Sequence, residues 1–546
     1  MVTGKRIVII GGVAGGANAA VRARRLSEDA VITMFERGPF VSFANCGLPY
    51  YIGGEIAERG KLTVQTPEAL AARFAINVKP LHNVTRIDPE KKQITVHSLT
   101  SGISFQESYD ELIIATGAAP LMPPIPGIAS KKLFTVRDIP DVDRIKESLA
   151  TTGWKKVGVV GGGYIGLEMV EQLHRIGIEV VLLQAQPQVM VQVDEEMASL
   201  IHTELTSHGV QLALGDPLAE VVEREGGVTL VTKGGARFDV DAGILALGVR
   251  PEATLAKEAG IKLGSKGGIE VDEYLQTSIP NIWAVGDVIE VTNFVTHEPS
   301  LIALAGPANR QGRMVADNIF GAGKRYSGTM GTAVIRVFDL TIACTGANER
   351  TLQAKGTPYH AIHLHPNSHA GYYPGAHPIA LKLLFSRDDA KILGAQAIGK
   401  DGVEKRIDVI ATAMKGNLSA VDLAELELCY APPFGSAKDP VNIAGMIAEN
   451  VMLGKVSPIS PREITPETFL LDVRDPSEHA KGAIPNAAHI PLNELRKKLH
   501  ELPKDREIVA YCQSGQRSYY ACRILTMNGF ACRNLSGAYK TWSAAS

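Results

Sequence analysis

Short apolar runs alternate with longer amphipathic segments along most of the chain, a pattern typical of α/β proteins. The run RIVII at 6–10 is followed by a glycine-rich turn, a segment with helical spacing and a second apolar run, VITMF, at 31–35. The same order begins again with KVGVV at 156–160 and VVLL at 180–183. This repetition predicts two folds of the strand–turn–helix–strand type, one inserted in the other.

The rest of the chain divides into two further parts. Residues 323–452 alternate short strands with helices and have no glycine-rich fingerprint. Pro, Ser and charged residues gather at 453–468, which indicates a linker, and a strand, loop and helix follow it. We therefore expect an α/β protein with a first dinucleotide-binding domain at 1–118 plus 250–322, a second at 119–249, an α+β domain at 323–452, a linker at 453–462 and a small α/β domain at 463–546.

The two glycine-rich turns differ in how closely they match the dinucleotide-binding fingerprint. Gly161, Gly163 and Gly166 fit G-x-G-x-x-G directly after a strand. In the first turn, Gly11 and Gly16 fit, but Val13 replaces the middle glycine. These glycines permit the turn, the approach of a pyrophosphate and the close packing of helix on strand. The helix that follows attracts phosphates to its N-terminus.

Two such sites imply two dinucleotides, a bound flavin (FAD) and a diffusing nicotinamide. Glu36 ends the second strand of the first fold, where its carboxylate would accept hydrogen bonds from a ribose diol. Gln184 holds the matching position in the second fold, with no Arg or Lys in QAQPQ, which favours NADH and leaves NADPH open. Asp287 in AVGDV is either a flavin ligand or an ordinary turn residue. The predicted cofactor-binding residues are Gly11, Val13, Ala14, Gly15, Gly16, Glu36, Arg37, Ser42, Asn45, Ala115, Thr116, Gly117, Gly161, Gly163, Tyr164, Ile165, Gly166, Gly248, Gly286 and Asp287.

Composition and charge limit the partners and the cellular compartment that we expect for the protein. Hydrophobic residues make up 45% and charged residues 21%, with a net charge of -2, so nucleic acid and anionic membranes are not expected as partners. No apolar run is long enough to span a bilayer, and no secretory signal precedes the first strand. The cysteines are scattered, so we expect a reducing cytoplasm, where a reactive cysteine has a catalytic role.

The segments GGVAGG, SFANCGLPYYIGG, ATGAAP, GGGYIGLE and AVGD occur in the order seen in single-cysteine flavoprotein disulfide reductases. The resemblance covers about residues 4–452 and is strongest to coenzyme A disulfide reductases. It implies FAD and Cys46 as the redox cysteine. With no second cysteine nearby, Cys46 must pair with an external sulfur or form a sulfenic acid. A helix start at LPYYIGG and the flavin would both favour the Cys46 thiolate.

The same resemblance implies roles for further residues. Tyr430 in ELELCYAPPFGSAKDPVN would reach the cysteine of the partner in a homodimer. Tyr372 is a candidate for a second such tyrosine, and its neighbour Tyr373 is the alternative. Basic and polar side chains would meet the phosphates of coenzyme A. Five histidines between 360 and 377 indicate polar surface rather than a metal site, because no other ligand stands at a zinc spacing. The predicted substrate-binding residues are Asn18, Arg22, Arg25, Arg73 and Lys438.

The segment YCQSGQRSYYA at 511–521 resembles the active loop of rhodaneses, over about residues 463–546. Cys512 would carry a persulfide in a cradle of backbone N–H groups, and Arg517 would add a positive charge. Asp472 and Arg474 match the opening strand of that family. The cysteines predicted to be structural are Cys429, Cys522 and Cys532.

These resemblances imply an enzyme, driven by NADH or NADPH, that reduces coenzyme A persulfide, polysulfide or coenzyme A disulfide through Cys46. Coenzyme A would be a substrate or a bound mixed disulfide, and Cys512 would handle sulfane sulfur. Two alternatives stay open. One is an NADH oxidase or peroxidase using a Cys46 sulfenate, against which Ala14 argues because related peroxidases carry a histidine there. The other is a sulfur carrier whose flavoprotein part senses redox state.

Overall fold

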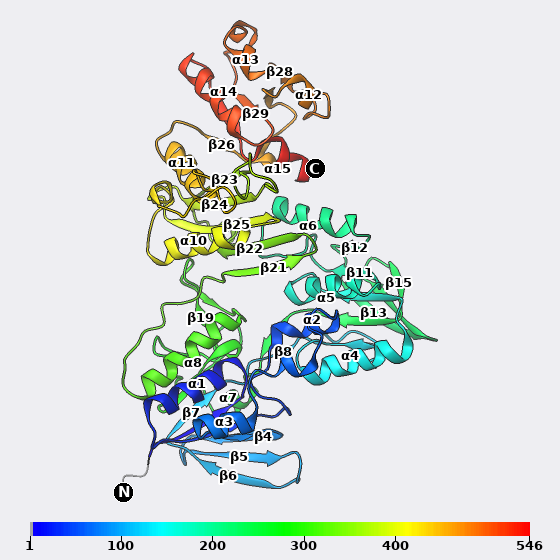
Figure 1. Cartoon of the computed structure of the whole chain (residues 1–546), viewed down its shortest axis with the longest axis vertical. Coiled ribbons are helices and arrows are strands. Elements are labelled where there is room, and N and C mark those ends of the chain that lie inside the picture. The colour runs from blue at the N-terminus through cyan, green and yellow to red at the C-terminus, as the bar shows by residue number, and fades with distance from the viewer. Residues whose placement is uncertain (1–3, 546) are drawn as a thin grey trace. The chain divides into compact units, whose positions relative to one another are not determined.

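The computed structural model describes residues 4–545 and contains two compact units (Figure 1). Unit 1 consists of Met1–Pro187 and Gly209–Gly331, and unit 2 of Gln188–His208 and Thr332–Ser546. Within the described range, no helix has both the length and the apolar character needed to cross a membrane.

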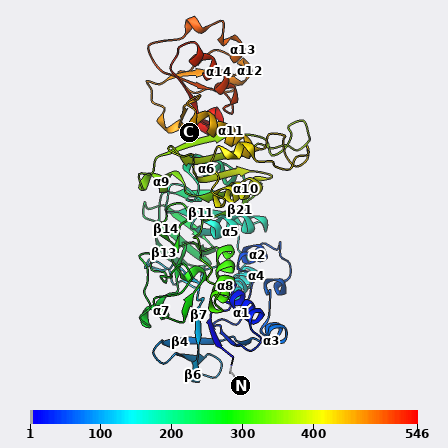
Figure 2. The ribbon, with the colours of Figure 1, turned by 90° about the vertical axis from the view of Figure 1, so that its left-hand side faces the viewer.

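An all-parallel sheet forms the core of the first fold in unit 1. Its three central strands are nearly continuous apolar runs, as expected when helices and loops cover both faces. Helix α1 (Ala14–Leu26) lies beside α8 (Ala305–Ile319) in both views (Figures 1 and 2). Gly312 allows this contact, because a Cβ there would lie 2.2 Å from the carbonyl oxygen of Gly15. The strands run in the order β18 (Ile282–Ala284), β7 (Glu111–Ile114), β1 (Arg6–Ile10), β2 (Val31–Phe35) and β3 (Asn77–Lys79).

A second all-parallel sheet repeats this plan. Helix α5 (Tyr164–Arg175) follows β10, and α4 (Ile139–Thr152) precedes it. The strand order is β12 (Gln211–Leu214), β11 (Glu179–Gln184), β10 (Lys156–Val160), β16 (Ala242–Leu245) and β9 (Leu133–Phe134).

Smaller elements complete unit 1. Two antiparallel sheets consist of β4 (His82–Asp88), β5 (Gln93–Ser98) and β6 (Ser104–Ser108), and of β13 (Leu218–Arg224), β14 (Gly227–Thr232) and β15 (Arg237–Val240). The remaining strands pair as β8 (Ala118–Pro120) with β17 (Val249–Pro251) and β19 (Val291–Thr292) with β20 (Pro299–Ser300). The short helices are α2 (Leu48–Ile52), α3 (Pro67–Phe74) and α7 (Thr254–Glu258).

An antiparallel sheet forms the middle part of unit 2. Its central strands β24 and β25 are buried along almost their whole length, so helices must cover both faces. The strands run in the order β21 (Ala333–Val337), β22 (Leu340–Gly346), β25 (Ile392–Gly399), β24 (Ala380–Ser386) and β23 (Tyr359–Leu364). The helices are α6 (Glu195–Ser207), α9 (Glu349–Ala354), α10 (Val403–Lys415) and α11 (Pro440–Met452).

The C-terminal part of unit 2 is a small parallel α/β domain. Its first strand, β26, lies within the segment that the sequence predicts to be a linker. A two-residue strand is too short for periodicity to reveal it. The strand order is β26 (Pro458–Ile459), β30 (Cys532–Leu535), β29 (Ile508–Tyr511), β27 (Phe469–Asp472) and β28 (Ala488–His489). The helices are α12 (Pro476–His479), α13 (Leu492–Leu495), α14 (Gln516–Met527) and α15 (Ala538–Ala545).

A fully buried lysine joins three elements of unit 2. Lys382 of β24 has no exposed surface, and its Nζ lies 2.8 Å from Asp194 and 2.7 Å from Glu349 and also contacts Glu196. Burial alone would lower the pKa of Lys382, yet the three carboxylates raise it above its usual value. The three carboxylate oxygens lie within 4.8 Å of one another, as in a metal site, but the ammonium group takes the place of a cation.

Histidines connect the antiparallel sheet of unit 2 to the C-terminal domain. His363 is buried, and its ring nitrogens contact Ser536 Oγ at 2.8 Å and Glu196 Oε1 at 3.0 Å. His365 Nε2 lies 2.8 Å from Thr541 Oγ1, and burial lowers the pKa of His365 to about 3. The expectation of polar surface is therefore wrong for His363, because Ser536 covers it from 173 residues away.

Replacing Lys382 by alanine tests the buried cluster. We expect Lys382→Ala to lower the stability of unit 2 by ~3–5 kcal/mol, because two buried carboxylates and a partly buried one lose the ammonium group that they share. The exposed pair between Lys400 and Asp339, 2.8 Å apart, provides the control, and Lys400→Ala should cost less than ~1 kcal/mol. Urea unfolding followed by circular dichroism measures both variants. Equal midpoints for the two would contradict a structural role of the cluster.

Candidate active site

In both glycine-rich turns of unit 1, the backbone of the helix packs directly against the backbone of the turn after the preceding strand. Gly11 and Gly161 have φ angles of 101° and 111°, which side chains rarely adopt. A Cβ on Gly16 would lie 1.9 Å from the carbonyl oxygen of Gly11, and one on Gly166 would lie 1.8 Å from that of Gly161. Any side chain at these positions would push the helix away and move its N-terminus.

The structure explains why Val13 replaces the middle glycine of the first turn. Val13 is the N-cap of α1 with φ −101°, and Gly163 is the N-cap of α5 with φ −87°. Neither value requires glycine. Neither helix has a side-chain cap or an acidic residue in its first turn, so the first N–H groups are left for an anion.

Glu36 and Gln184 occupy equivalent places. Glu36 accepts hydrogen bonds from the N–H of Gly12 at 2.8 Å and of Gly38 at 2.7 Å. Gln184 Oε1 accepts one from the N–H of Gly162 at 3.2 Å. Both side chains thus fix the glycine-rich turn from the end of the next strand, but only Glu36 carries a charge there.

The other predicted cofactor residues of unit 1 lie at the carboxyl ends of strands or in the loops after them. Gly117 and Gly248 have positive φ, and a Cβ on either would meet open space. Gly286 donates its N–H to Gln311 at 2.8 Å, and burial raises the pKa of the neighbouring Asp287. The remaining contacts are Arg37 Nη2 to Glu252 Oε2 at 2.8 Å, Thr116 Oγ1 to the Glu252 carbonyl at 2.9 Å and the Ser42 N–H to the Gly12 carbonyl at 2.8 Å.

This arrangement fits two dinucleotides. At each turn, the first and third glycines leave room for backbone only, the helix presents uncapped N–H groups, and an acceptor stands at the next strand end. Phosphates and a ribose require this combination of donors and acceptors.

Cys46 lies in unit 1 in the short helical turn η1 (Asn45–Gly47), directly before α2. The side chain is exposed and can meet an external substrate. Tyr50, one turn further on, donates its hydroxyl to Glu168 Oε1 of α5 at 3.2 Å. Burial raises the pKa of Glu168 to about 7.

The polypeptide around Cys46 does not favour its thiolate. Desolvation and the carboxylates of Glu168 and Asp287 raise the pKa of Cys46, against the expectation from a helix start. Helix α2 has only five residues, and the net result of these effects is a raised pKa of Cys46. Glu168 was not among the predicted residues, although it follows the third fingerprint glycine, Gly166, by two positions.

The predicted coenzyme A residues of unit 1 spread over α1 and α3. Asn18 Nδ2 donates to Asn309 Oδ1 at 2.7 Å, and Arg22 forms an ion pair of 2.6 Å with buried Asp317. Arg25 and Arg73 are exposed at the ends of their helices. Lys438 is exposed and belongs to unit 2.

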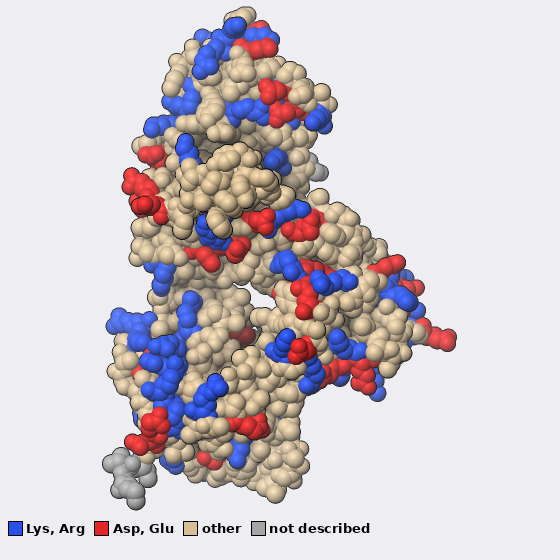
Figure 3. Space-filling model, viewed as in Figure 1, with Lys and Arg blue, Asp and Glu red and all other residues tan. Residues whose placement is uncertain are grey.

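Two arginines missed by sequence reasoning extend this face. Arg310 and Arg313 are exposed on α8, which lies beside α1. Figure 3 shows Lys and Arg side chains gathered over these helices. The spacing of three residues in RQGR was the available signal, but only the contact between α1 and α8 reveals a common surface.

The tyrosine pair of unit 2 is formed by Tyr372 and Tyr430. Their hydroxyl groups share a hydrogen bond of 2.9 Å, which raises the pKa of Tyr430. Both rings are exposed, by 77% and 47%, so the pair is open to another molecule. Tyr373 packs against His369 instead. Cys429, predicted to be structural, is exposed.

Cys512 follows β29 and lies at the base of the loop before α14. It is only 1% exposed. The N–H of Gly515 donates to its Sγ at 3.1 Å and the hydroxyl of Ser518 at 3.5 Å. Gly515, with φ 104°, is the N-cap of α14 and makes the turn possible.

Arg517 is held by carboxylates of the C-terminal domain. It makes two hydrogen bonds to Glu478, at 2.6 and 2.7 Å, and one to Asp475 at 3.1 Å. Its charge is therefore already paired and less available to an anionic sulfur than the sequence predicts. Arg474 is buried and forms an ion pair of 2.7 Å with buried Asp472, so it stabilises the fold of the domain.

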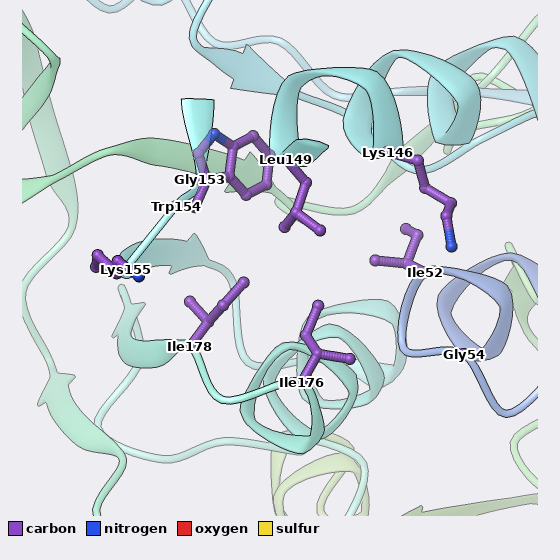
Figure 4. Close-up of a pocket in the computed structure, with 9 residues that line it drawn as sticks. All are labelled: Ile52, Gly54, Lys146, Leu149, Gly153, Trp154, Lys155, Ile176 and Ile178. Carbon is purple, nitrogen blue, oxygen red and sulfur yellow. The ribbon is translucent and has the colours of Figure 1, made fainter. Parts of the chain in front are cut away.

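A cavity of about 320 Å³ opens on unit 1 (Figure 4). It lies at the amino end of β10, whereas the glycine-rich turn follows the carboxyl end of that strand. Neither fingerprint glycines nor Cys46 line it. Its lining residues are Ile52, Gly54, Lys146, Leu149, Gly153, Trp154, Lys155, Ile176 and Ile178.

Family models match three parts of the chain. Residues 5–312 match pyridine nucleotide-disulphide oxidoreductase, residues 332–440 match its dimerisation domain, and residues 461–545 match the rhodanese-like domain.

Relatives and solved structures agree with these matches. The coenzyme A disulfide reductase of Staphylococcus haemolyticus is 36% identical over 451 residues, which are 82% of this chain and 100% of the relative. The structure of reduced Bacillus anthracis CoADR-RHD has a TM-score of 0.98 and 48% identity, and covers 99% of this chain and 98% of its own. The NAD-dependent persulfide reductase from A. fulgidus has a TM-score of 0.93 and 36% identity, and covers 98% of this chain and 100% of its own.

Removing the charge of Glu168 tests its effect on Cys46. In Glu168→Gln we expect the pKa of Cys46 to fall by roughly one pH unit, because a nearby negative charge is lost. The rate of alkylation by iodoacetamide as a function of pH measures it, with the Cys46 peptide followed by mass spectrometry. Glu179→Gln removes an exposed carboxylate elsewhere and should leave the profile unchanged. Identical profiles in all three proteins would contradict the electrostatic coupling.

Proposed function

Because the chain belongs to the pyridine nucleotide-disulphide oxidoreductase family, we propose that it reduces coenzyme A disulfide and coenzyme A persulfide or polysulfide. The single observation that carries the proposal is the exposed, unpaired Cys46 beside a dinucleotide site in a chain that also carries the Cys512 loop. The relatives named coenzyme A disulfide reductase and persulfide reductase support both substrate classes.

The predicted family, fold class and cofactors are confirmed by the comparisons. FAD and a pyridine nucleotide are the cofactors of this family. When bound, they supply the two electrons that reduce a sulfur–sulfur bond. We propose that the turn with Gly11 and Gly16 holds FAD, with Glu36 at its ribose, and that the turn with Gly161 holds the nicotinamide cofactor. Neutral Gln184 leaves NADPH possible beside NADH.

Cys46 acts as the nucleophile in this proposal. Its thiolate attacks one sulfur of the substrate, the substrate S–S bond breaks, and one thiol leaves after taking up a proton. The other half remains on Cys46 as a mixed disulfide or a persulfide. Two electrons and two protons then restore the Cys46 thiol and release the second thiol or hydrogen sulfide. The phosphates of coenzyme A would bind Arg25, Arg73 and the arginines of α8.

Cys512 handles sulfane sulfur separately. Its sulfur accepts hydrogen bonds from Gly515 and Ser518, donors that suit an anionic persulfide. Arg517, although paired with Glu478, keeps a positive charge close to the loop.

The match to a dimerisation domain supports a homodimer. We propose that the exposed Tyr430 and Tyr372 reach Cys46 of the partner subunit, where a tyrosine hydroxyl would give a proton to the leaving thiol. A reducing cytoplasm, which keeps Cys46 from forming stable disulfides, would suit this chemistry.

The mass of the intact, unreduced protein tests the nucleophile and its partner. We expect an adduct with the mass of coenzyme A that disappears on reduction and is absent from Cys46→Ser, because Cys46 alone forms the mixed disulfide. An adduct that persists in Cys46→Ser would place the nucleophile elsewhere. A sulfenate mass on Cys46 would instead support an NADH oxidase or peroxidase.

Separate variants test the division of work between the two cysteines. Cys46→Ser should lower NADH-dependent reduction of coenzyme A persulfide by at least about a thousandfold, because the nucleophile is lost. It should leave sulfur transfer from thiosulfate to cyanide unchanged. Cys512→Ser should show the opposite result, and Cys429→Ser should change neither rate. Loss of both activities in Cys46→Ser or in Cys512→Ser would contradict the proposal of two separate sites. If the wild type shows no NADH turnover, a sulfur carrier is favoured instead.

A further inference from the structure

Two thiols in the C-terminal domain lie in direct contact. Cys522 of α14 and Cys532 of β30 are free cysteines whose sulfur atoms are 3.2 Å apart. Cys522 is 2% exposed, whereas Cys532 is partly exposed. Both were predicted to be structural, and their contact, between residues ten positions apart on a helix and a strand, is seen only in the structure.

Both elements also hold the loop of Cys512. Ser518, which donates to Cys512 Sγ, precedes Cys522 by one helical turn and lies on the same face of α14. Asn534, two residues after Cys532, donates from Nδ2 to the carbonyl oxygen of Gly515 at 3.3 Å. Gly515 in turn donates its N–H to Cys512 Sγ. Each thiol therefore shares an element with a residue that holds the Cys512 loop, Cys522 with Ser518 on α14 and Cys532 with Asn534 on β30.

We propose that Cys522 and Cys532 form a reversible disulfide by exchange with small disulfides, and that this bond switches off sulfur transfer at Cys512. The proposal goes beyond reduction at Cys46 and rests only on the sulfur-transfer part of the proposed function. Nothing in the proposed reduction of coenzyme A compounds uses either cysteine.

The exchange balances in two steps. The partly exposed Cys532 loses its proton and attacks a small disulfide, which forms a mixed disulfide on Cys532 and releases one thiolate. Cys522 then loses its proton and attacks the Cys532 sulfur, which releases the second thiolate. Two protein thiols are oxidised, and one small disulfide is reduced to two thiols. A small thiol in excess reverses both steps.

The bond would change the Cys512 loop because it draws α14 and β30 together. These two elements carry Ser518 and Asn534, which hold the loop. A disulfide brings its sulfur atoms to about 2.0 Å, about 1 Å closer than the present contact. Contact with Cys532 and burial raise the pKa of Cys522 well above its usual value, so the partly exposed Cys532, and not Cys522, starts the exchange. Movement of α14 toward β30 shifts Ser518 relative to Cys512, whose strand β29 lies next to β30.

Oxidised glutathione is the probe for the test on the full-length protein. After incubation and blocking of free thiols, we expect a digest to contain a peptide pair linked through Cys522 and Cys532. Sulfur transfer from thiosulfate to cyanide should fall by roughly tenfold, the effect of weakening one hydrogen bond to an anionic sulfur. Dithiothreitol should restore it.

Two variants separate this switch from direct attack on Cys512. Cys532→Ser, at the partly exposed position, should keep its activity through oxidation, whereas Cys429→Ser should lose activity like the wild type. Equal loss in Cys532→Ser would overturn the proposal, because glutathione would then be acting on Cys512 itself. Free thiols at both positions, or a linked pair with full activity, would also overturn it. These results do not depend on NADH-dependent reduction, which is measured separately.

Discussion

The close approach of a helix to the end of a parallel strand is the constraint on which all three reactive regions depend. At Gly11, Gly161 and Gly515 the backbone turns with φ between 101° and 111°, and the following helices α1, α5 and α14 begin without a side-chain cap. Each turn therefore presents backbone N–H groups at the carboxyl edge of a parallel sheet. In the proposed function, the same backbone arrangement would serve two pyrophosphates and a sulfur anion, although the domains differ in size and ligand.

This constraint is local, and the sequence predicts it well. A strand, a glycine-rich turn and a helix fit within about twenty residues, so the order of residues alone locates the fingerprints at 11–16 and 161–166 and the loop at 511–521. The fold class and family follow from their order along the chain, and the comparisons confirm both. The domain boundaries and the roles of single residues stay predictions.

Contacts between distant residues could not be predicted. Tyr50 and Glu168 are separated by 118 residues, and His363 and Ser536 by 173. In the sequence, Lys382 is one lysine within an apolar strand. In the structure it is the centre of a buried cluster with acids at α6 and α9. Arg517 shows the same limit, because Glu478 and Asp475 pair with it from another element. Periodicity and motifs describe what one segment can do, whereas charge pairing depends on which segments meet.

The surroundings of Cys46 and Cys512 differ in their effect on a sulfur anion. Cys512 is buried and accepts hydrogen bonds from Gly515 and Ser518, so the loop itself provides the donors that a sulfur anion needs. Cys46 is exposed and lies near two carboxylates that raise its pKa. In the proposed function, its activation would therefore come from the bound cofactor, the partner's tyrosines and a substrate that displaces water. A thiol that becomes reactive only in the assembled site is protected from wasteful reaction with other disulfides, because its nucleophilic form is scarce until cofactor and substrate are in place.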